Sequence, residues 1–494
     1  MRLRVTPRYT LVACAVACVC LLAGAALAGA ANNVSRVRTY STRPTLPLRT
    51  GLLDPRTLSG PDMSVAFALA RQTGATYVRE PVSWQAIAPA TQPTGFVPSD
   101  PTTPGYTWAA LDATLEAAQA AGLTPILGIA SPPTWGYTTQ PAGVNGGTPD
   151  VTALRDFATA LATHYDGLTP GVPAAHVFQV WNEPNNSMDL NPASPTVYRA
   201  MVNAVAEGVH GVDPANLVVA GGLDPFGHLQ SKNQQWYSVA PLAFMRSVLC
   251  LSKGAHPHAT CKDPAHFDVW SHHPYTFGGA FGKAKLPDDV ELGDLPKMRA
   301  VLTAAVRLHH VVSANPVQFW VTEFGWDTNP PRPHAASLSL ASRWTAESLH
   351  QMWLSGISLV TWFLLEDYPS PSPYQCGLYF YSSSIQSARA KPVLTAFRFP
   401  FVAYLGKKKT TISVWGRDAT SDKETVGIQV RRGKSGPWRS VARISSNANG
   451  IFQATLKLNA TKKDWLRASA TGSGNSLAFS LKRSKDPHIG PWGN

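Results

Sequence analysis

The sequence predicts an α/β fold, a (β/α)8 barrel followed by a small all-β, immunoglobulin-like sandwich, and two observations carry this prediction. Between residues 48 and 403, short β-rich segments alternate eight times with helix-length amphipathic segments, as a closed parallel sheet of βα units requires. From residue 404 to residue 494 the pattern changes to short alternating strands separated by turn residues. Such regular spacing is typical of a β-sandwich.

The expected elements follow one another in this order. The eight barrel strands are predicted at residues 49–53, 76–79, 123–129, 176–182, 217–222, 267–273, 317–323 and 358–364. Helices with Ala, Leu and charged residues at helical spacing are predicted between them, for example at 108–121 and 152–165, and a last one at 391–404. The sandwich strands are predicted at 411–415, 425–431, 439–444, 451–456 and 465–470.

Residues 1–31 are predicted to be an export signal. Basic residues precede an apolar run, 11–31, whose small residues fit an Ala-x-Ala cleavage site. The run is long enough to cross a bilayer if it is not cleaved, so an N-terminal membrane anchor is the alternative. In either case the rest of the chain is expected outside the cytoplasm. Residues 32–47 are polar and rich in Arg and Pro, and we expect them to be a linker.

The net charge of +13 is unevenly spread. Residues 404–494 hold 17 Lys and Arg against 5 Asp and Glu, whereas residues 32–403 hold 23 against 25. This asymmetry predicts an anionic partner for the basic domain, and in an exported protein that is a cell wall, a membrane or an acidic polysaccharide rather than nucleic acid. A basic domain that is merely solvated is the alternative.

Three of the six cysteines lie in the leader, which leaves Cys250, Cys261 and Cys376. An oxidising compartment favours a disulfide between the near neighbours Cys250 and Cys261, with Cys376 free. The alternative is a metal site that includes His256 and His258, but their spacing matches no zinc pattern.

Two motifs place a carboxylate at the end of a predicted strand. Glu183 lies in Trp-Asn-Glu-Pro after the fourth strand, and Glu323 lies in Thr-Glu-Phe-Gly-Trp at the end of the seventh. The active site of a (β/α)8 barrel lies at the carboxyl ends of its strands, so the two side chains are expected to meet across the mouth. Hydrolysis of a glycosidic bond needs such a pair. The alternative is that both are loop caps or ion-pair partners.

These paired motifs resemble those of glycoside hydrolase clan A, most closely family 39 or the cellulase-like family 5, over residues 48–403. The resemblance implies a retaining double displacement with Glu183 as acid/base and Glu323 as nucleophile, their carboxyl groups roughly 5 to 5.5 Å apart. The chain departs from cellulase-like members in one respect, because no histidine follows its third strand.

The same resemblance assigns roles to four neighbours. It implies that Asn182 binds the sugar 2-hydroxyl, that Arg79 keeps the nucleophile anionic, that Tyr275 holds the nucleophile and that His273 contacts the sugar. An ion pair of Arg79 with Glu80 is the alternative, but successive residues of a strand point to opposite faces.

Four tryptophans are candidates for sugar contacts. Trp362, on the eighth strand, resembles the tryptophan that forms the sugar platform in the clan. Trp84, Trp135 and Trp326 each follow a strand and are expected to serve further subsites, although core packing explains any one of them equally well.

Together these observations predict an exported retaining β-glycosidase that hydrolyses O-glycosidic bonds of an oligo- or polysaccharide. No cofactor is expected, and no metal, because His272 and His273 point in different directions and no ligand set accompanies them. The alternatives are a catalytically silent carbohydrate-binding or wall-associated protein, and a transglycosylase that uses the same covalent intermediate. We further expect a chain without residues 404–494 to retain turnover of small substrates.

Overall fold

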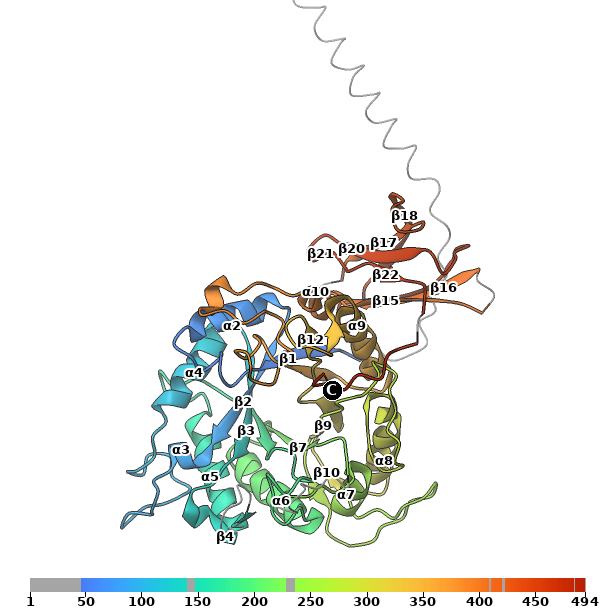
Figure 1. Ribbon diagram of the computed structural model, residues 1–494. Coiled ribbons are helices and arrows are strands. Elements are labelled where there is room, and N and C mark those ends of the chain that lie inside the picture. Colours follow the sequence, from blue (N-terminus) through green and yellow to red (C-terminus); the bar gives the residue numbers. More distant parts are fainter. Residues whose placement is uncertain are drawn as a thin grey trace, which may run out of the picture.

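The computed structural model describes residues 46–139, 147–227, 236–407, 410–419, 423–483 and 485–493. The predicted leader, and all but the last two residues of the predicted linker, lie outside these ranges. Eight parallel strands close into a barrel in the order β1-β14-β11-β9-β7-β6-β3-β2, which confirms the predicted fold (Figure 1). In chain order they are β1 Arg49–Leu53, β2 Tyr77–Ser83, β3 Thr124–Ala130, β6 Val177–Val180, β7 Leu217–Leu223, β9 Val269–His272, β11 Gln318–Val321 and β14 Leu359–Phe363.

Helices cover the outside of the barrel (Figure 1). They are α2 Met63–Gln72, α3 Trp84–Ile87, α4 Ala109–Ala120, α5 Val151–His164, α6 Pro195–Val212, α7 Pro241–Val248, α8 Leu295–Arg307, α9 Leu338–Leu354 and α10 Pro392–Arg398. Local sequence explains where they begin. The side chain of Asp150 accepts hydrogen bonds from two amides of the first turn of α5, and Ser194 caps α6 ahead of Pro195.

Short strands form two-stranded pairs in the loops of the barrel. They are β4 Tyr137–Thr139 with β5 Thr148–Pro149, β8 Ala265–His266 with β10 Val311–Val312, and β12 Thr328–Asn329 with β13 Ala336–Ser337.

The barrel interior is filled by large apolar side chains from six of its strands. They are Ile126, Val177, Val219, Val269, Trp320 and Leu359. Such a layer makes the interior of a (β/α)8 barrel a packed core and not a pore. Polar side chains are therefore left to the carboxyl ends of the strands, where the loops gather.

Two antiparallel sheets follow the barrel, as expected of a β-sandwich (Figure 1). One sheet is formed by β15 Phe401–Leu405, β16 Thr411–Arg417 and β19 Ile451–Lys457. The other is formed by β17 Thr425–Arg431, β18 Trp438–Ser445, β20 Trp465–Ala470, β21 Gly474–Asn475 and β22 Phe479–Ser480. Burial alternates along β17, where Val426, Ile428 and Val430 face the core.

The helix predicted at residues 391–404 is wrong in its second half. Helix α10 ends at Arg398, and residues from Phe401 onward pair with β16 as strand β15. Pro400 explains the break, because the ring of a proline disfavours helical backbone at the residue before it, and Phe399 is not helical, with φ −130° and ψ 68°.

The sandwich is joined to the barrel by buried contacts. Arg417, 2% exposed, donates a hydrogen bond from Nη1 to Oγ1 of Thr50 in β1 at 3.3 Å. After β22 the chain leaves the sandwich, passes α9 and reaches the carboxyl end of the barrel, where Figure 1 marks the C-terminal end. The indole of Trp344 in α9 donates to Oδ1 of Asp486 on this segment at 2.9 Å.

Cys250 and Cys261 form a disulfide, as predicted, and Cys376 is free and buried. Within the described ranges, the helices are all too short or too polar to span a lipid bilayer.

One fully buried ion pair ties the loop after β14 to the start of α10. The ammonium of Lys391 lies 2.6 Å from Oδ1 of Asp367 and also donates to Oγ1 of Thr328 and to the carbonyl oxygen of Gln375. Both charged side chains are 0% exposed. Burial raises the pKa of Asp367 to about 6 and lowers the pKa of Lys391.

Replacing Lys391 with methionine would leave the carboxylate of Asp367 buried without its cation. We expect Lys391→Met to lower the free energy of unfolding by about 3–5 kcal/mol, measured by urea denaturation followed by circular dichroism. Lys253→Met is the matched control, since the exposed side chain of Lys253 pairs with Asp288 at the surface, and it should cost at most about 1 kcal/mol. Equal losses in the two variants would contradict the structural importance of the buried pair.

Candidate active site

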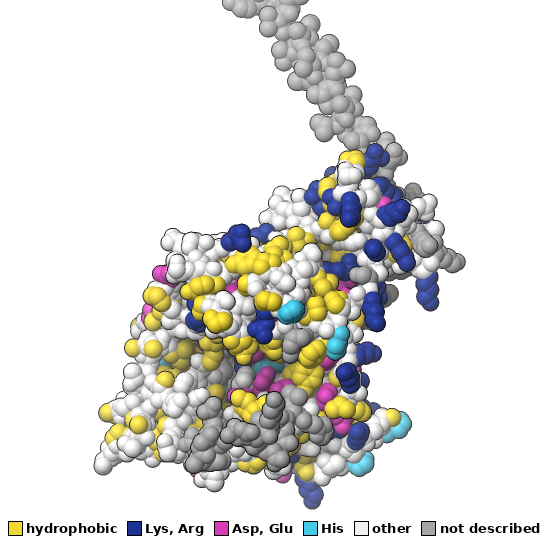
Figure 2. All heavy atoms as spheres, in the orientation of Figure 1, with side chains coloured by type: hydrophobic (Ala, Val, Ile, Leu, Met, Phe, Trp, Pro, Cys, Tyr) yellow, Lys and Arg dark blue, Asp and Glu magenta, His cyan; other side chains and the backbone are white. Residues whose placement is uncertain are grey.

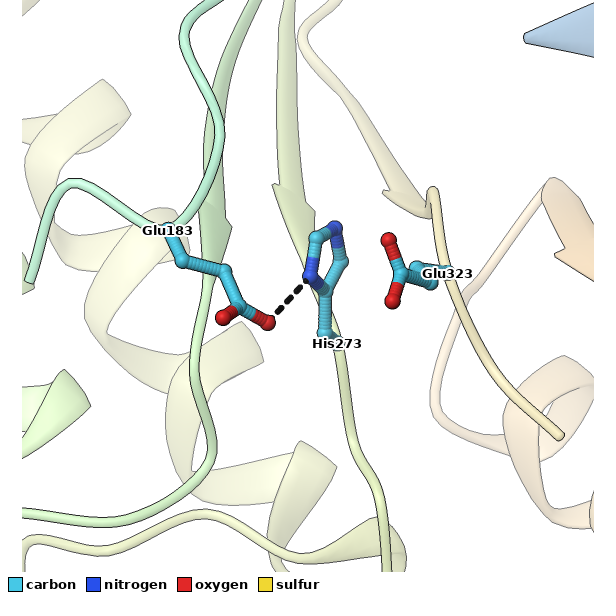
Figure 3. Close-up of side chains that lie close together, drawn as sticks. All are labelled: Glu183, His273 and Glu323. Atoms are coloured by element: carbon cyan, nitrogen blue, oxygen red, sulfur yellow. Dashed lines mark hydrogen bonds and ion pairs between the residues drawn. The ribbon is translucent and has the colours of Figure 1, made fainter. Parts of the chain in front are cut away.

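Glu183 and Glu323 meet at the carboxyl end of the barrel. Glu183 follows β6, Glu323 follows β11, and His273 follows β9 between them. One oxygen of each carboxylate and one ring nitrogen of His273 all lie within 4.8 Å of one another. Figure 3 shows the two carboxylates pointing toward each other from either side of the imidazole. The structure thus brings together the two glutamates that the motifs singled out.

Glu323 is held by two donors. Nη1 of Arg79 lies 3.0 Å from Oε2 of Glu323, and the hydroxyl of Tyr275 donates to Oε1 at 2.8 Å. Nη2 of the same guanidinium donates to Oδ1 of Asn182 at 2.8 Å. Hydrogen bonds from a cation and a hydroxyl bind a carboxylate more strongly than a carboxylic acid. Arg79 and Tyr275 therefore lie where their predicted role requires, and Arg79 also fixes Asn182.

Glu183 has very different surroundings. Burial raises its pKa well above the ordinary value, and the negative charges of Asp224 and Glu323 raise it further. Its Oε1 lies 2.9 Å from Nδ1 of His273. These surroundings favour the protonated form of Glu183, whereas the two hydrogen bonds to Glu323 favour a carboxylate there.

His273 contacts Glu183 directly, which corrects its expected role as a sugar ligand. Its side chain is 0% exposed, and Nε2 lies 3.2 Å from Oγ1 of Thr322. Burial, with the nearby charge of Arg79, lowers the pKa of His273 well below the ordinary value, so the ring is neutral. A neutral ring can donate from Nε2 to Thr322 and accept at Nδ1 from protonated Glu183. Its neighbour His272 points elsewhere, with Nε2 2.9 Å from the carbonyl oxygen of Val290.

The backbone is strained where Glu183 leaves β6. Trp181 and Glu183 have φ angles of 69° and 37°, a region that L residues rarely adopt. Two hydrogen bonds hold this conformation. The indole of Trp181 donates to the carbonyl oxygen of Asp189 at 2.8 Å, and the amide of Glu183 donates to the carbonyl oxygen of Gly222 at 3.0 Å. Strain of this kind persists only when the surroundings enforce it, and it is common at functional sites.

Two further carboxylates lie near the pair and were missed from the sequence. Asp224 follows β7, and burial raises its pKa to about 6; burial, with the charge of Glu323, raises the pKa of Asp189 to about 7. Asn185 positions the Asp224 loop, because its side chain donates to the carbonyl oxygen of Asp224 and accepts from its amide. Asp224 could have been predicted as a site residue because it comes directly after the fifth strand. Asp189 lies in a loop where the sequence gives no such signal.

A cavity of about 1060 Å³ opens above the glutamates. Figure 2 shows acidic side chains gathered in a hollow on this face of the molecule. Its aromatic lining is Phe226, Tyr275, Phe277, Phe363, Tyr374 and Trp492. Trp492 and its neighbours in 485–493 belong to the cavity, so removal of residues 404–494 would take away part of its lining.

The sugar platform expected at Trp362 needs correction. Trp362 is 1% exposed, and its indole donates to the carbonyl oxygen of Cys376 at 2.9 Å. The next residue, Phe363, lines the cavity instead. Successive residues of a strand face opposite sides, so an error of one residue changes a cavity contact into a core contact.

The other three tryptophans are also outside the cavity lining. Trp84 stacks on Phe157, with ring centroids 4.9 Å apart, and Trp326 packs against Trp344 at 4.8 Å. Trp135 is partly buried, and its indole donates to a backbone carbonyl at 2.8 Å. Packing against the core, which was the alternative explanation for their positions in the sequence, therefore accounts for these three tryptophans.

The side-chain atoms of Glu183, His273 and Glu323 that could bind a metal ion already have protein partners. Arg79 and Tyr275 take the two oxygens of Glu323, and His273 uses its ring nitrogens on Glu183 and Thr322. A guanidinium next to these carboxylates supplies the positive charge that a metal ion would otherwise bring.

Known families and structures share this architecture. The family model described as Cellulase (glycosyl hydrolase family 5) matches residues 47–364, although no histidine follows the third strand. A family 39 glycoside hydrolase from Bacteroides cellulosilyticus WH2 superposes with a TM-score of 0.50 at 16% identity, covering 83% of this chain and 79% of that one. A monomeric beta-xylosidase from Caulobacter crescentus CB15 gives 0.50 at 15% identity, covering 88% and 97%. At such identity the structures show the fold alone. No curated protein sequence matches the chain.

The charge of Asp224 is one cause of the raised pKa of Glu183, second to burial. We expect Asp224→Asn to lower the pKa of Glu183, because ionised Glu183 then has one anionic neighbour fewer. The titration of the Glu183 carboxyl carbon by 13C NMR measures this shift. Glu116→Gln, a change of an exposed carboxylate on α4, is the control and should leave the titration unchanged. An unchanged or higher pKa in Asp224→Asn would contradict the electrostatic account.

Proposed function

The chain belongs to the cellulase family, glycosyl hydrolase family 5, and we propose that it is an exported retaining β-glycosidase that hydrolyses O-glycosidic bonds of an oligo- or polysaccharide. The observation that carries the proposal is the pair Glu183 and Glu323, in which one oxygen of each carboxylate lies within 4.8 Å of one oxygen of the other. Retaining enzymes have carboxyl groups roughly 5 to 5.5 Å apart, whereas inversion needs roughly 6.5 Å or more to admit a water molecule. The short separation favours retention.

The surroundings of each glutamate support a division of labour. Glu323, bound as a carboxylate by Arg79 and Tyr275, attacks the anomeric carbon while Glu183 gives its proton to the departing oxygen. In the second step ionised Glu183 takes a proton from water, and the water oxygen displaces Glu323 from the sugar. Throughout, the neutral imidazole of His273 holds the Glu183 carboxyl at its place in the site.

Arg79 and Asn182 are proposed to act together on the sugar. The guanidinium fixes the Oδ1 atom of Asn182, so the amide group of that side chain is oriented before substrate arrives. In this position Asn182 is proposed to bind the sugar 2-hydroxyl, a contact that strengthens as the ring becomes oxocarbenium-like.

Export is supported by the disulfide and by the predicted leader. The bond between Cys250 and Cys261 suits an oxidising compartment. The basic, apolar and small-residue order of residues 1–31 has the form of a secretory signal.

Single substitutions test the two roles. We expect Glu323→Ala to abolish turnover of every glycoside, because no covalent intermediate can form. Glu183→Ala should lose about 10²- to 10⁴-fold on substrates with poor leaving groups and retain far more activity on activated aryl glycosides, whose leaving group needs no proton. Initial rates on 4-nitrophenyl β-glycosides and on β-linked oligosaccharides, with NMR detection of the first product anomer, measure both effects. Equal loss from both changes on an activated substrate, or an inverted product, would refute the assignment.

The basic domain is proposed to bind an anionic polysaccharide or cell-wall surface. Its cations are mostly exposed; Arg432, Lys434, Arg439, Arg443, Lys457, Lys462 and Lys463 all face solvent. Figure 2 shows Lys and Arg side chains gathered on this part of the molecule. Exposed charge of one sign attracts polyanions over about a Debye length.

We expect the protein to bind an acidic polysaccharide such as polygalacturonate at low salt and to be released near 0.5 M NaCl, where screening is nearly complete. Arg439→Glu/Arg443→Glu, which changes two exposed arginines of β18, should weaken binding in a co-sedimentation assay. Arg307→Glu, an exposed arginine at the end of α8, is the matched control on the barrel. Binding that does not respond to salt would show that the attraction is not electrostatic.

A further inference from the structure

Residues 485–493 lie against the active-site loops although they follow the sandwich in sequence. The amide of Gly278, in the loop after β9, donates to the carbonyl oxygen of Ile489 at 3.1 Å. The amide of Asp327, in the loop after β11, donates to the carbonyl oxygen of Pro491 at 2.8 Å. The loops that carry Tyr275 and Glu323 are thus both bonded to this segment.

A turn at the end of the segment presents Trp492. The amide of Gly493 donates to the carbonyl oxygen of Gly490 at 3.2 Å, and Gly493 has a φ of 71°. A Cβ atom at Gly493 would approach Ala335 and Arg332 to 3.0–3.1 Å, so a glycine suits this position. Pro491 is buried and Trp492 is half-buried. The turn therefore fixes the direction in which the indole leaves the backbone.

The indole of Trp492 completes an aromatic wall beside Glu323. Its ring centroid lies 4.5 Å from that of Tyr275, 5.1 Å from that of Tyr374 and 6.3 Å from that of Phe363. All four rings line the cavity, and the hydroxyl of Tyr275 is bonded to the nucleophile. Among the described residues that line the cavity, Trp492 is the only tryptophan.

We propose that Trp492 is a sugar-stacking residue of the cleft, which contacts the ring adjacent to the one that Glu323 attacks. The inference rests on the proposed glycosidase function and adds to it an oligosaccharide of at least two rings as the substrate. A rigid indole with one part packed on its neighbours and another open to the cavity suits the apolar face of a sugar ring. The four tryptophans expected to contact sugar lie outside the cavity lining, so this segment supplies the tryptophan surface of the cavity.

Kinetics and binding on the full chain test this inference with two variants. Trp492→Ala should raise KM for cellotetraose or xylotetraose about tenfold, with a much smaller change on the corresponding 4-nitrophenyl monosaccharide. Trp492→Phe should recover most of the affinity. Trp438→Ala removes a partly buried tryptophan from β18 of the sandwich, and it serves as the matched control that should leave KM unchanged. Calorimetric binding of the tetrasaccharides to Glu323→Ala, with and without Trp492→Ala, measures the same contact without turnover.

The outcomes separate the inference from the proposed function. If the wild-type chain turns over no glycoside, the proposed function fails, whereas weaker tetrasaccharide binding after Trp492→Ala still supports the sugar contact. If kcat falls equally on both substrate lengths with KM unchanged, Trp492 acts only by supporting Tyr275, and the inference is overturned. Unchanged kinetics and unchanged tetrasaccharide binding in Trp492→Ala would also overturn it.

Discussion

The guanidinium of Arg79 is the interaction on which the site depends. It is a buried cation among carboxylates, and it joins Glu323 after β11 to Asn182 after β6 from its own position on β2. It lowers the pKa values of Glu183 and Asp189 that burial raises. The next residue, Glu80, points to the other face, where burial raises its pKa to about 8. Strand β2 thus places a cation inside the site and a protonated carboxyl outside it. A shift of the strand by one residue would exchange the two faces, so this arrangement requires a single register.

Two chemically identical side chains acquire opposite roles from their neighbours. Glu323 receives a cation and a phenol, whereas Glu183 receives a neutral imidazole and the field of Asp224. The difference arises from the positions of the strand ends, because β2 carries Arg79, Asp224 follows β7, and His273 and Tyr275 follow β9. A barrel serves this purpose well, since its packed interior leaves the strand ends close together and free to carry polar groups.

The parts of the fold and site that depend on local pattern were predictable. The eight strands follow from β-rich runs at βα spacing, and Glu183, Glu323, Arg79 and Tyr275 follow from motifs at strand ends. Side-chain direction was less predictable, since a shift of one residue separates Trp362 in the core from Phe363 in the cavity. Trp492 was not predictable at all, because no local signal reports that a segment beyond the sandwich returns to the barrel mouth.

Because residues 485–493 return to the mouth of the barrel, the sandwich domain cannot simply be exchanged for another domain. In many multidomain enzymes an accessory domain can be exchanged, because only a linker joins it to the catalytic one. Here the sandwich lies in the chain between the barrel and a segment that lines the cleft. Any replacement domain must therefore return its own end to the loops after β9 and β11. Recombination at the boundary near Phe401 would otherwise yield a barrel with both glutamates and one side of its cleft open.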